Sequence, residues 1–262
     1  MPNSHLPGLP NPQSYDTRVP GVVLDQVTGL MWQQSAPGKL QTFIGAQREC
    51  ERLSLAGYDD WRLPSRIELV SILDGTRTQP SIDVNTFPGT PSHWFWTSSP
   101  AVDAPNSAWY VYFYFGYPKI EEKRNRFSVR CVRTAVARPA VPKRYDVQAE
   151  TVRDVATGLT WQRAVPSGQF KFDAARAYCA QLALSGKKGW RVPTLTELLT
   201  LIDERAGSPM IDRGAFPNTP GEQFWTSTNF SGGRLEGWYV YFSHGDALYD
   251  LVASPYRVRC VI

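Results

Sequence analysis

The chain has 262 residues, of which 42% are hydrophobic and 13% aromatic, a composition typical of packed globular proteins and not of disordered ones. No apolar run reaches the roughly 18 residues of a membrane-spanning helix, so we expect no direct membrane insertion. The net charge is +4, but residues 15–134 carry 13 Lys and Arg against 12 Asp and Glu, and residues 145–262 carry 12 against 12. Nucleic-acid binding needs basic residues gathered on one face, so these counts argue against a nucleic-acid partner.

The chain starts with MPNSHLPGLPNPQS, and we interpret residues 1–14 as a Pro-rich tail. No basic region followed by an apolar core is visible there, so the stretch does not resemble a signal peptide. Two interpretations follow. The protein stays inside the cell, or the chain is a mature form with an added Met1.

From Gly29 onward the chain repeats itself at an offset of 129 residues. The matched pairs include Trp32/Trp161, Cys50/Cys179, Pro64/Pro193, Glu68/Glu197, Trp96/Trp225, Trp109/Trp238 and Cys131/Cys260. One offset held over most of a domain length indicates two copies of one domain. We therefore predict domain 1 at residues 15–134, an exposed linker at 135–144 and domain 2 at 145–262.

The first element predicted in each copy is a helix with one apolar face. The residues of that face are Phe43, Ala46, Cys50 and Leu53 in the first copy and Phe172, Ala175, Cys179 and Leu182 in the second. Thr42 can cap the first helix, and Gly57 is a plausible stop. The second helix should stop near Gly186.

A second helix follows, and its start is marked by a capping box. In PSRIEL, Ser65 can accept from the backbone of Glu68 while Glu68 returns to the Ser65 N–H. Thr194 and Glu197 repeat this chemistry in the second copy. The preceding prolines, Pro64 and Pro193, keep the helix from extending backwards.

Strands are predicted after the second helix. AWYVYFYF alternates, with Trp109, Val111, Phe113 and Phe115 on one face and Tyr110, Tyr112 and Tyr114 on the other. FSVRCVR and YRVRCVI are predicted to close the two copies as strands. Two helices plus short antiparallel strands in each copy predict an α+β fold, twice.

Four cysteines occupy matched positions, two in each copy and 81 residues apart. No C-x-x-C pair suggests a metal site. We favour one disulfide in each domain, Cys50–Cys131 and Cys179–Cys260, and four buried free thiols are the alternative. Disulfides indicate an oxidising compartment, so we expect a periplasmic, extracellular or cell-surface protein whose leader has been removed.

The motifs D-x-x-TG-L-x-W-Q, WR-[LV]-P-[ST]-x-x-EL, FWTS and VRCV resemble the bacterial Lcl C-terminal domain, almost end to end in both copies. More distantly, the capped helix and WTSSP resemble the formylglycine-generating enzyme family. A disulfide from helix to last strand is similar to that of C-type lectins. These resemblances imply two tandem C-type-lectin-like domains.

The resemblance implies a binding function, in which variable loops bind glycans or proteins. In the Lcl domain the implied ligands are sulfated glycans. Two departures limit it. The EPN or QPD and WND motifs of calcium-dependent lectins are missing, since the nearest string, APN at 104–106, lacks the acidic ligand. Neither copy has the surplus of basic residues that sulfated glycans favour.

Catalysis finds no support in the sequence. The three histidines, His5, His93 and His244, do not match between copies and suggest no triad. The matched carboxylates Asp25/Asp154, Glu68/Glu197, Asp74/Asp203 and Asp83/Asp212 are interpreted as turn and cap residues, or as partners of Arg62/Arg191 and Arg130/Arg259, rather than as calcium ligands. The matched tryptophans are interpreted as core. We expect no catalytic residue, no metal and no cofactor.

Recognition is instead expected where the copies differ, since loops on a rigid scaffold commonly carry it. Three stretches differ: SPAVDAPNSA against TNFSGGRLEG, YPKIEEKRNR against DALYDLVASP, and PSHW against PGEQ. The candidate ligand-binding residues are His93, Trp94, Asp103, Asn106, Tyr117, Lys119, Asn229, Arg234, Glu236 and Tyr249. Neutral drift of exposed turns is the alternative explanation.

The leading hypothesis is a non-catalytic surface or secreted binding protein for a glycan or protein ligand. The second is a structural or assembly module of the cell envelope. An oxidase of the formylglycine-generating type is the third. The sequence does not indicate the oligomeric state.

Overall fold

The computed structural model describes residues 1–4, 8–136, 143–233 and 235–262. The chain divides into two compact units, Met1–Arg138 and Pro139–Ile262, called here unit 1 and unit 2. Most of the predicted linker 135–144 lies outside the described residues, as does His5. Of the predicted tail, Gln13 is buried, and its side-chain amide donates to the Leu73 carbonyl at 2.9 Å.

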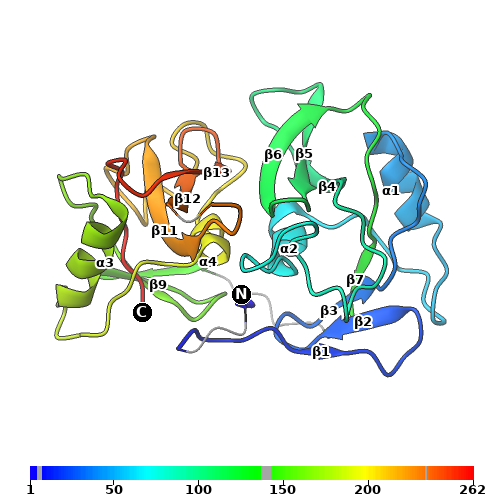
Figure 1. Ribbon diagram of the computed structural model, residues 1–262, viewed down its shortest axis with the longest axis horizontal. Helices are drawn as coiled ribbons and strands as arrows, with labels where there is room; N and C mark the ends of the chain where they lie inside the picture. The colour runs from blue at the N-terminus through cyan, green and yellow to red at the C-terminus, as the bar shows by residue number, and fades with distance from the viewer. Residues whose placement is uncertain (5–7, 137–142, 234) are drawn as a thin grey trace. The chain divides into compact units, whose positions relative to one another are not determined.

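Unit 1 has two sheets and two helices. The four-stranded sheet has the order β1-β2-β3-β7 and the three-stranded sheet the order β4-β5-β6, with antiparallel neighbours throughout. Helix α2 lies between the two sheets, and α1 flanks the three-stranded one (Figure 1). The elements are β1 Tyr15–Asp16, β2 Val22–Asp25, β3 Leu30–Gln33, α1 Phe43–Glu51, α2 Arg66–Ser71, β4 Trp94–Pro100, β5 Ser107–Tyr112, β6 Tyr117–Glu122 and β7 Val132–Thr134.

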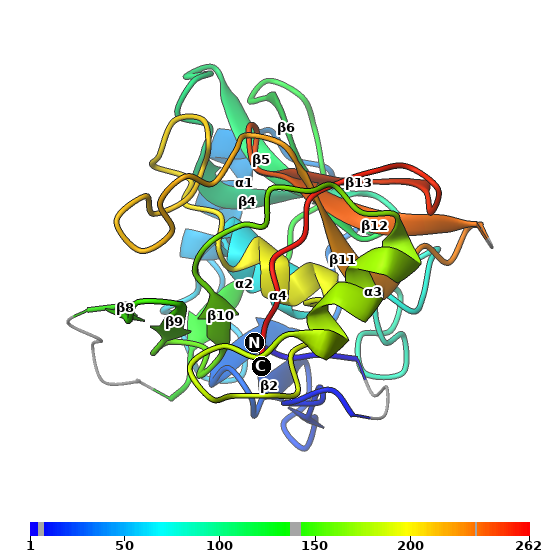
Figure 2. The same cartoon turned by 90° about the vertical axis from the view of Figure 1, so that its left-hand side faces the viewer.

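Unit 2 repeats these layers with the sheets β10-β9-β8 and β11-β12-β13. Helix α4 lies between the sheets and α3 on the flank (Figure 2). The α+β class and the two tandem domains, each with two helices and short antiparallel strands, are therefore confirmed. The elements are β8 Tyr145–Val147, β9 Thr151–Asp154, β10 Thr160–Gln162, α3 Phe172–Gln181, α4 Leu195–Leu199, β11 Gln223–Asn229, β12 Glu236–Tyr241 and β13 Asp246–Leu251.

The helix starts agree with the sequence. Thr42 accepts from the Gly45 N–H at the start of α1, whereas Lys171 caps α3 without a side-chain bond. Both predicted capping boxes are present, at the starts of α2 and α4. Each box also holds an arginine, because Arg62 pairs with Glu68 at 2.6 Å and Arg191 with Glu197 at 2.7 Å.

The predicted ends of the first helices were wrong. Helix α1 ends at Glu51, well before Gly57, and α3 ends at Gln181. The chain then makes a tight turn in which the N–H groups of Leu55 and Tyr58 each donate to the other residue's carbonyl at 3.0 Å. Gly57 has φ +81° and forms part of this turn, so its left-handed conformation serves a turn and not a helix cap.

Two strand predictions also need correction. β5 ends at Tyr112, and the chain turns over 113–116, so Tyr114 and Phe115 lie outside the strand. Tyr110, on the tyrosine face of β5, is also buried, at 7% exposed. Cys131 lies just before β7, and Val261 of unit 2 makes only isolated bridges, to Trp161 and Arg191.

Both predicted disulfides are present, Cys50–Cys131 and Cys179–Cys260. Each joins the flanking helix to the segment that closes its unit, inside the hydrophobic core. The matched tryptophans Trp32, Trp61, Trp96 and Trp109 are at most 2% exposed, which confirms them as core residues. Each unit is therefore closed on its own by a covalent link and an aromatic core.

The FWTS motif ties the three-stranded sheet to the capped helix. Thr97 donates to the Trp109 carbonyl at 2.8 Å, and the Ser98 N–H donates to the Pro64 carbonyl at 2.7 Å. The strand register shifts at this point, between Trp96 and Pro100. Unit 2 has the same shift and the same contacts through Thr226 and Ser227. The motif therefore fixes the strand from which the variable loop leaves.

The arginines of VRCV do not pair with carboxylates, contrary to that interpretation. Arg130 is fully buried, and its guanidinium donates to the carbonyls of Gln33 and Gln34 at 2.7 and 2.6 Å and to the Thr90 hydroxyl at 2.7 Å. Arg259 repeats these contacts in unit 2. Burial lowers the pKa of each arginine to about 9. These side chains crosslink the backbone, and the motif marks the fold.

Candidate functional site

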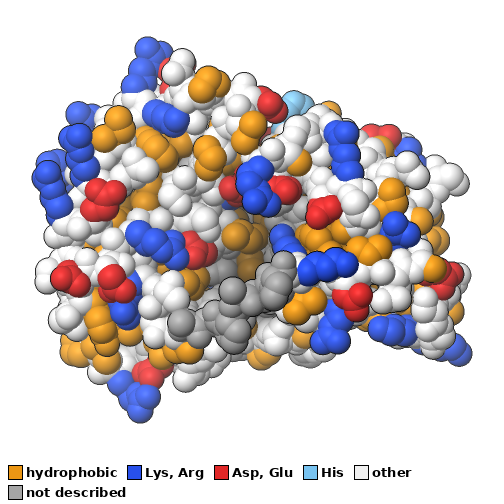
Figure 3. Space-filling view, turned by 180° about the vertical axis from the view of Figure 1, so that it is seen from behind, with side chains coloured by type: hydrophobic (Ala, Val, Ile, Leu, Met, Phe, Trp, Pro, Cys, Tyr) orange, Lys and Arg blue, Asp and Glu red, His pale blue; other side chains and the backbone are white. Residues whose placement is uncertain are grey.

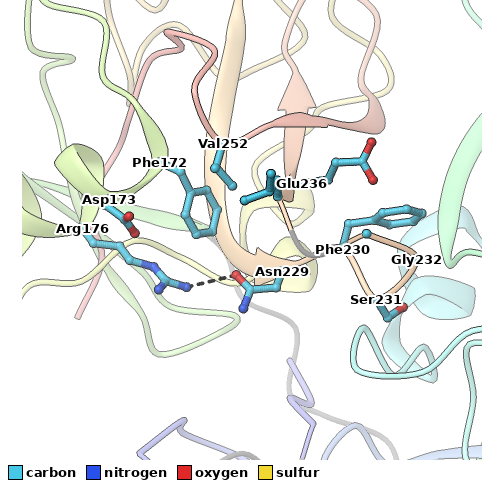
Figure 4. Close-up of a pocket in the computed structure, with 11 residues that line it drawn as sticks. Phe172, Asp173, Arg176, Asn229, Phe230, Ser231, Gly232, Glu236 and Val252 are labelled. Atoms are coloured by element: carbon cyan, nitrogen blue, oxygen red, sulfur yellow. Dashed lines mark hydrogen bonds between the residues drawn. The ribbon is translucent and has the colours of Figure 1, made fainter.

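Unit 2 has a groove of about 730 Å³ beside the loop that joins β11 to β12 (Figure 4). One wall comes from α3 through Phe172, Asp173 and Arg176, and the other from the loop and the end of β13. The remaining lining residues are Asn229, Phe230, Ser231, Gly232, Gly233, Leu235, Glu236 and Val252. The groove thus joins two of the stretches that differ between the copies.

Arg176 holds the two walls together. Its guanidinium donates to the Ser227 carbonyl at 3.0 Å and to Asn229 Oδ1 at 3.4 Å, the bond drawn in Figure 4. It also lies 4.5 Å from the centroid of the Phe172 ring, a cation–π contact. Phe172 can reach this place because Gly237 has no side chain, and a Cβ there would come within 2.5 Å of the ring. The floor of the groove therefore depends on Gly237.

The loop itself is held by aromatic stacking. Phe230 is buried, and its ring lies 3.7 Å from that of Tyr249 with 6° between the planes. A Cβ on Gly232 would meet the Phe230 ring at 2.5 Å, so this loop conformation requires a glycine. Leu235 and Leu251 remain exposed at 68% and 53%. The lining of the groove is consequently mixed, with Leu235 and Val252 apolar and with charged groups from α3 and from Glu236 on the loop side.

Unit 1 has a different surface at the matched place. A smaller hollow of about 380 Å³ is lined by Asn106, Glu122, Lys123 and Arg124. Lys123 is the counterpart of Val252, since the carbonyls of these two residues accept from the N–H groups of Phe43 and Phe172, both at 3.1 Å. The Lys123 ammonium donates to the Pro105 carbonyl at 2.6 Å and lies 5.4 Å from the Phe43 ring. A lysine thus fills in unit 1 the space that is open in unit 2.

The structure separates the predicted site residues of unit 1 into two groups. Asp103 and Asn106 are exposed in the β4–β5 loop, next to the hollow. His93 and Trp94 lie where β4 begins, at the opposite end of the sheet, and Tyr117 lies there as well because it pairs with Tyr112, which pairs with Trp94. Lys119 lies two residues further along β6, opposite Tyr110.

In unit 2, Asn229 and Glu236 line the groove, and Tyr249 supports it from behind Phe230. Figure 4 shows the Glu236 carboxylate pointing away from Arg176. Arg234 lies outside the described residues. The sequence missed Asp173 and Arg176, whose counterparts are Ile44 and Gln47. Their difference between the copies, one turn apart on a helix surface, was the signal that could have identified them.

Charge on the surface is mixed. On the face drawn in Figure 3, Lys and Arg side chains of the described residues are interspersed with Asp and Glu, without a broad basic patch. Among the described residues, no three His, Cys, Asp or Glu side chains are grouped to hold a metal ion. No helix in that part of the chain combines the length and apolar character needed to cross a membrane.

The matched carboxylates act in turns and caps, as interpreted. Asp25 accepts from the N–H groups of Val27 and Thr28 at 2.9 and 3.1 Å. Burial of Glu68 raises its pKa, but hydrogen bonds from Arg62 and Ser65 outweigh burial, and the pKa of Glu68 is lowered. These groups are occupied with holding the backbone.

Comparison with protein families finds the Lcl C-terminal domain twice, at residues 21–133 and 150–262. No curated protein matches the chain at significant similarity. The two matched ranges span most of the chain, and each contains one disulfide, one capping box and the buried arginine of its VRCV motif, Arg130 or Arg259. The chain therefore belongs to the Lcl C-terminal domain family, of which it carries two copies in tandem.

Proposed function

We propose that this chain is a non-catalytic binding protein of the periplasm or cell surface, with two C-type-lectin-like domains that meet a glycan or protein ligand through their variable loops. One observation carries the proposal. In each unit, the two longest stretches that differ between the copies meet at the same end of the three-stranded sheet, against the first residue of the flanking helix. Variable segments that meet on a fixed scaffold are typical of recognition surfaces.

The groove of unit 2 is the better-formed of the two surfaces. It combines the exposed apolar side chain of Leu235 with the guanidinium of Arg176 and the carboxylate of Asp173 on the opposite wall. A concave surface that offers both apolar groups and charged groups can bind a ligand that is itself partly polar. The compartment proposed is consistent with the two disulfides.

The oxidase alternative has little chemical support. It requires a reactive cysteine, whereas all four cysteines are in disulfides and at most 1% exposed. A thiolate acts as a nucleophile only when it is free and accessible. A mass measurement under non-reducing conditions that finds four free thiols would revive that alternative.

The experiment is a binding screen against glycans and bacterial and host surface proteins, followed by Val252→Lys. The lysine should reproduce the plug that Lys123 forms in unit 1, donating to the loop backbone and covering Phe172. We expect any ligand of the groove to bind at least about tenfold more weakly, as for loss of a central contact region. Lys123→Val is the matched control, because it changes the other copy and leaves this groove intact.

Exchange of the matched residues 99–107 and 228–236 between the copies tests the loops directly and leaves Gly237 in place. Loss of binding in either exchange supports the proposal. Binding that survives both exchanges and Val252→Lys would contradict it and place the site elsewhere. The second hypothesis, an assembly module, predicts that Val252→Lys changes the oligomeric state measured by sedimentation, without a ligand in the screen.

A further inference from the structure

A row of aromatic rings lies at the other end of the three-stranded sheet of unit 1. We define the aromatic row as Trp94, Tyr112, Tyr114 and Tyr117. The Trp94 and Tyr112 rings are 5.3 Å apart and the Tyr112 and Tyr114 rings 5.7 Å, both with 21° between the planes. Tyr117 meets Tyr112 edge-on at 5.5 Å. Four neighbouring rings thus form a continuous surface.

The fold does not require this row. Unit 2 builds the same strands in the same register with other residues, since Gln223 pairs with Tyr241, which pairs with Asp246, as Trp94 pairs with Tyr112 and Tyr117. The counterpart of Tyr114 is Ser243. Three of the four aromatic side chains are therefore replaced by polar ones in a sheet that keeps its geometry.

The row is also open to solvent. The chain has nine tryptophans, of which eight are at most 2% exposed, whereas Trp94 is 43% exposed. Tyr112, Tyr114 and Tyr117 are all partly exposed. Large aromatic side chains contribute most of their energy when buried, so a partly exposed group of four rings, three of which the fold does not require, indicates a contact surface.

The residues around the aromatic row indicate which kind of ligand it can bind. Cross-strand pairing puts Lys119 and Glu121 on the same face as Tyr117, so charged side chains bound the row along β6, while the exposed Ile120 points to the opposite face. The surface is therefore a few rings wide and carries phenolic hydroxyls. A stable protein interface buries about 800 Å² on each partner around an apolar centre. A narrow aromatic strip bounded by charges does not suit that requirement.

We propose that the aromatic row is a second binding surface, for the apolar face of a sugar ring. Sugar C–H groups carry partial positive charge and are attracted to the negative faces of aromatic rings. The ring hydroxyls of the sugar can then reach the phenols of Tyr114 and Tyr117 and the ammonium of Lys119. This surface is independent of the loop site proposed above, because the β4–β5 loop leaves from the opposite end of the same strands.

The test uses Trp94 as its own probe. Iodide should quench the fluorescence of Trp94 and spare the eight buried tryptophans. We expect one member of a panel of cello-, malto-, chito- and xylo-oligosaccharides and a heparin hexasaccharide to protect Trp94 from iodide. Trp94→Gln should remove the quenchable fraction and weaken binding of that oligosaccharide at least about tenfold in calorimetry, the loss typical of a central aromatic contact.

The second copy supplies the other variants. Tyr114→Ser and Tyr117→Asp introduce residues that unit 2 carries in the same positions, so folding should be preserved, and each should weaken binding by about three- to tenfold. Val252→Lys, which fills the loop groove, should leave this binding unchanged. Val252→Lys therefore separates the two proposals, since binding at the loop groove can be lost while binding at the aromatic row is retained.

Three outcomes would overturn the inference. No oligosaccharide in the panel protects Trp94 at millimolar concentration. An oligosaccharide protects Trp94 from iodide, but calorimetry finds its binding unchanged in Trp94→Gln. Alternatively, Trp94→Gln changes the sedimentation coefficient while no oligosaccharide binds, which would assign the row to contact between copies of the chain.

Discussion

The interiors of the two units are built in the same way, whereas the ends of their three-stranded sheets differ. Arg130 and Arg259 make the same three contacts with lengths that agree to 0.1 Å. Tyr15 and Tyr145 pack edge-on against Phe87 and Phe216 at 5.3 and 5.2 Å. At the loop end, by contrast, unit 1 has a lysine plug where unit 2 has a groove.

The comparison indicates which side chains of the fold can be substituted. Contacts that satisfy buried polar groups cannot be altered singly, because an unpaired group costs about 1–3 kcal/mol. Side chains at the two ends of the three-stranded sheet satisfy no such buried group, and at both ends they differ between the copies. Unit 1 keeps aromatic rings at one end, and unit 2 keeps an open groove at the other. The interior built in the same way in both units is the scaffold on which these two surfaces differ.

The largest expected effect tests whether the units are independent. Replacing Cys50 and Cys131 together by alanine removes a link across 81 residues, which should cost unit 1 about 4 kcal/mol by the chain-entropy relation. Calorimetry of the double variant should show a lower transition for unit 1 and an unchanged transition for unit 2. Replacement of Cys179 and Cys260 is the control and should reverse the pattern. Both transitions moving together would show that the units unfold as one body.

A second effect should have opposite signs in the two units. Asp154 is fully buried and accepts from Arg144 at 2.8 Å, so Asp154→Asn should destabilise unit 2 by about 1–3 kcal/mol. Its counterpart Asp25 has no arginine partner among the described residues, and burial raises its pKa. Asp25→Asn should therefore leave unit 1 equally or more stable at neutral pH.

The pH dependence follows from the sign of the shift. Folded unit 1 holds the Asp25 proton more tightly than the unfolded chain does, so ionisation of Asp25 lowers stability as pH rises through its raised pKa. The gain from Asp25→Asn should be present above that pKa and vanish as pH falls toward the unfolded value. Chemical denaturation at pH 4 and pH 7 measures it. A larger gain at pH 4 would contradict the assignment.

The sequence could predict what depends on local spacing. The apolar faces of α1 and α3 and both capping boxes follow from residues at fixed short intervals, and the structure has them. The disulfides span 81 residues and were predicted from cysteines at matched positions in the two copies. The end of α1 could not be predicted, because the chain leaves the helix for a bridge at Leu55 and Tyr58, a contact outside the helical pattern. The partners of Arg130 were likewise invisible, since they are backbone carbonyls almost 100 residues away.

The candidate site was predictable only in part, for a related reason. Comparison of the copies located the loops, because loops differ as contiguous stretches. Arg176 differs from its counterpart as a single residue within a helix, and only the fold places it against Asn229. The split of the predicted unit 1 residues between two ends of a sheet also depends on strand direction. Differences between repeats therefore identify segments, and the structure sorts them into surfaces.

The smallest expected effect concerns the capping boxes, where the units should agree. Ser65→Ala and Thr194→Ala each remove a hydroxyl that accepts from the third residue of its helix, and each should cost about 1 kcal/mol. Arg62 and Arg191 still hold the glutamates, which keeps the loss small. The exchanges Ser65→Thr and Thr194→Ser serve as controls and should leave stability nearly unchanged, since each copy already uses the other residue. If Thr194→Ala lowers the free energy of unfolding clearly more than Ser65→Ala does, the near-complete burial of Thr194 contributes as well. The shared motif would then stabilise the two units by different amounts.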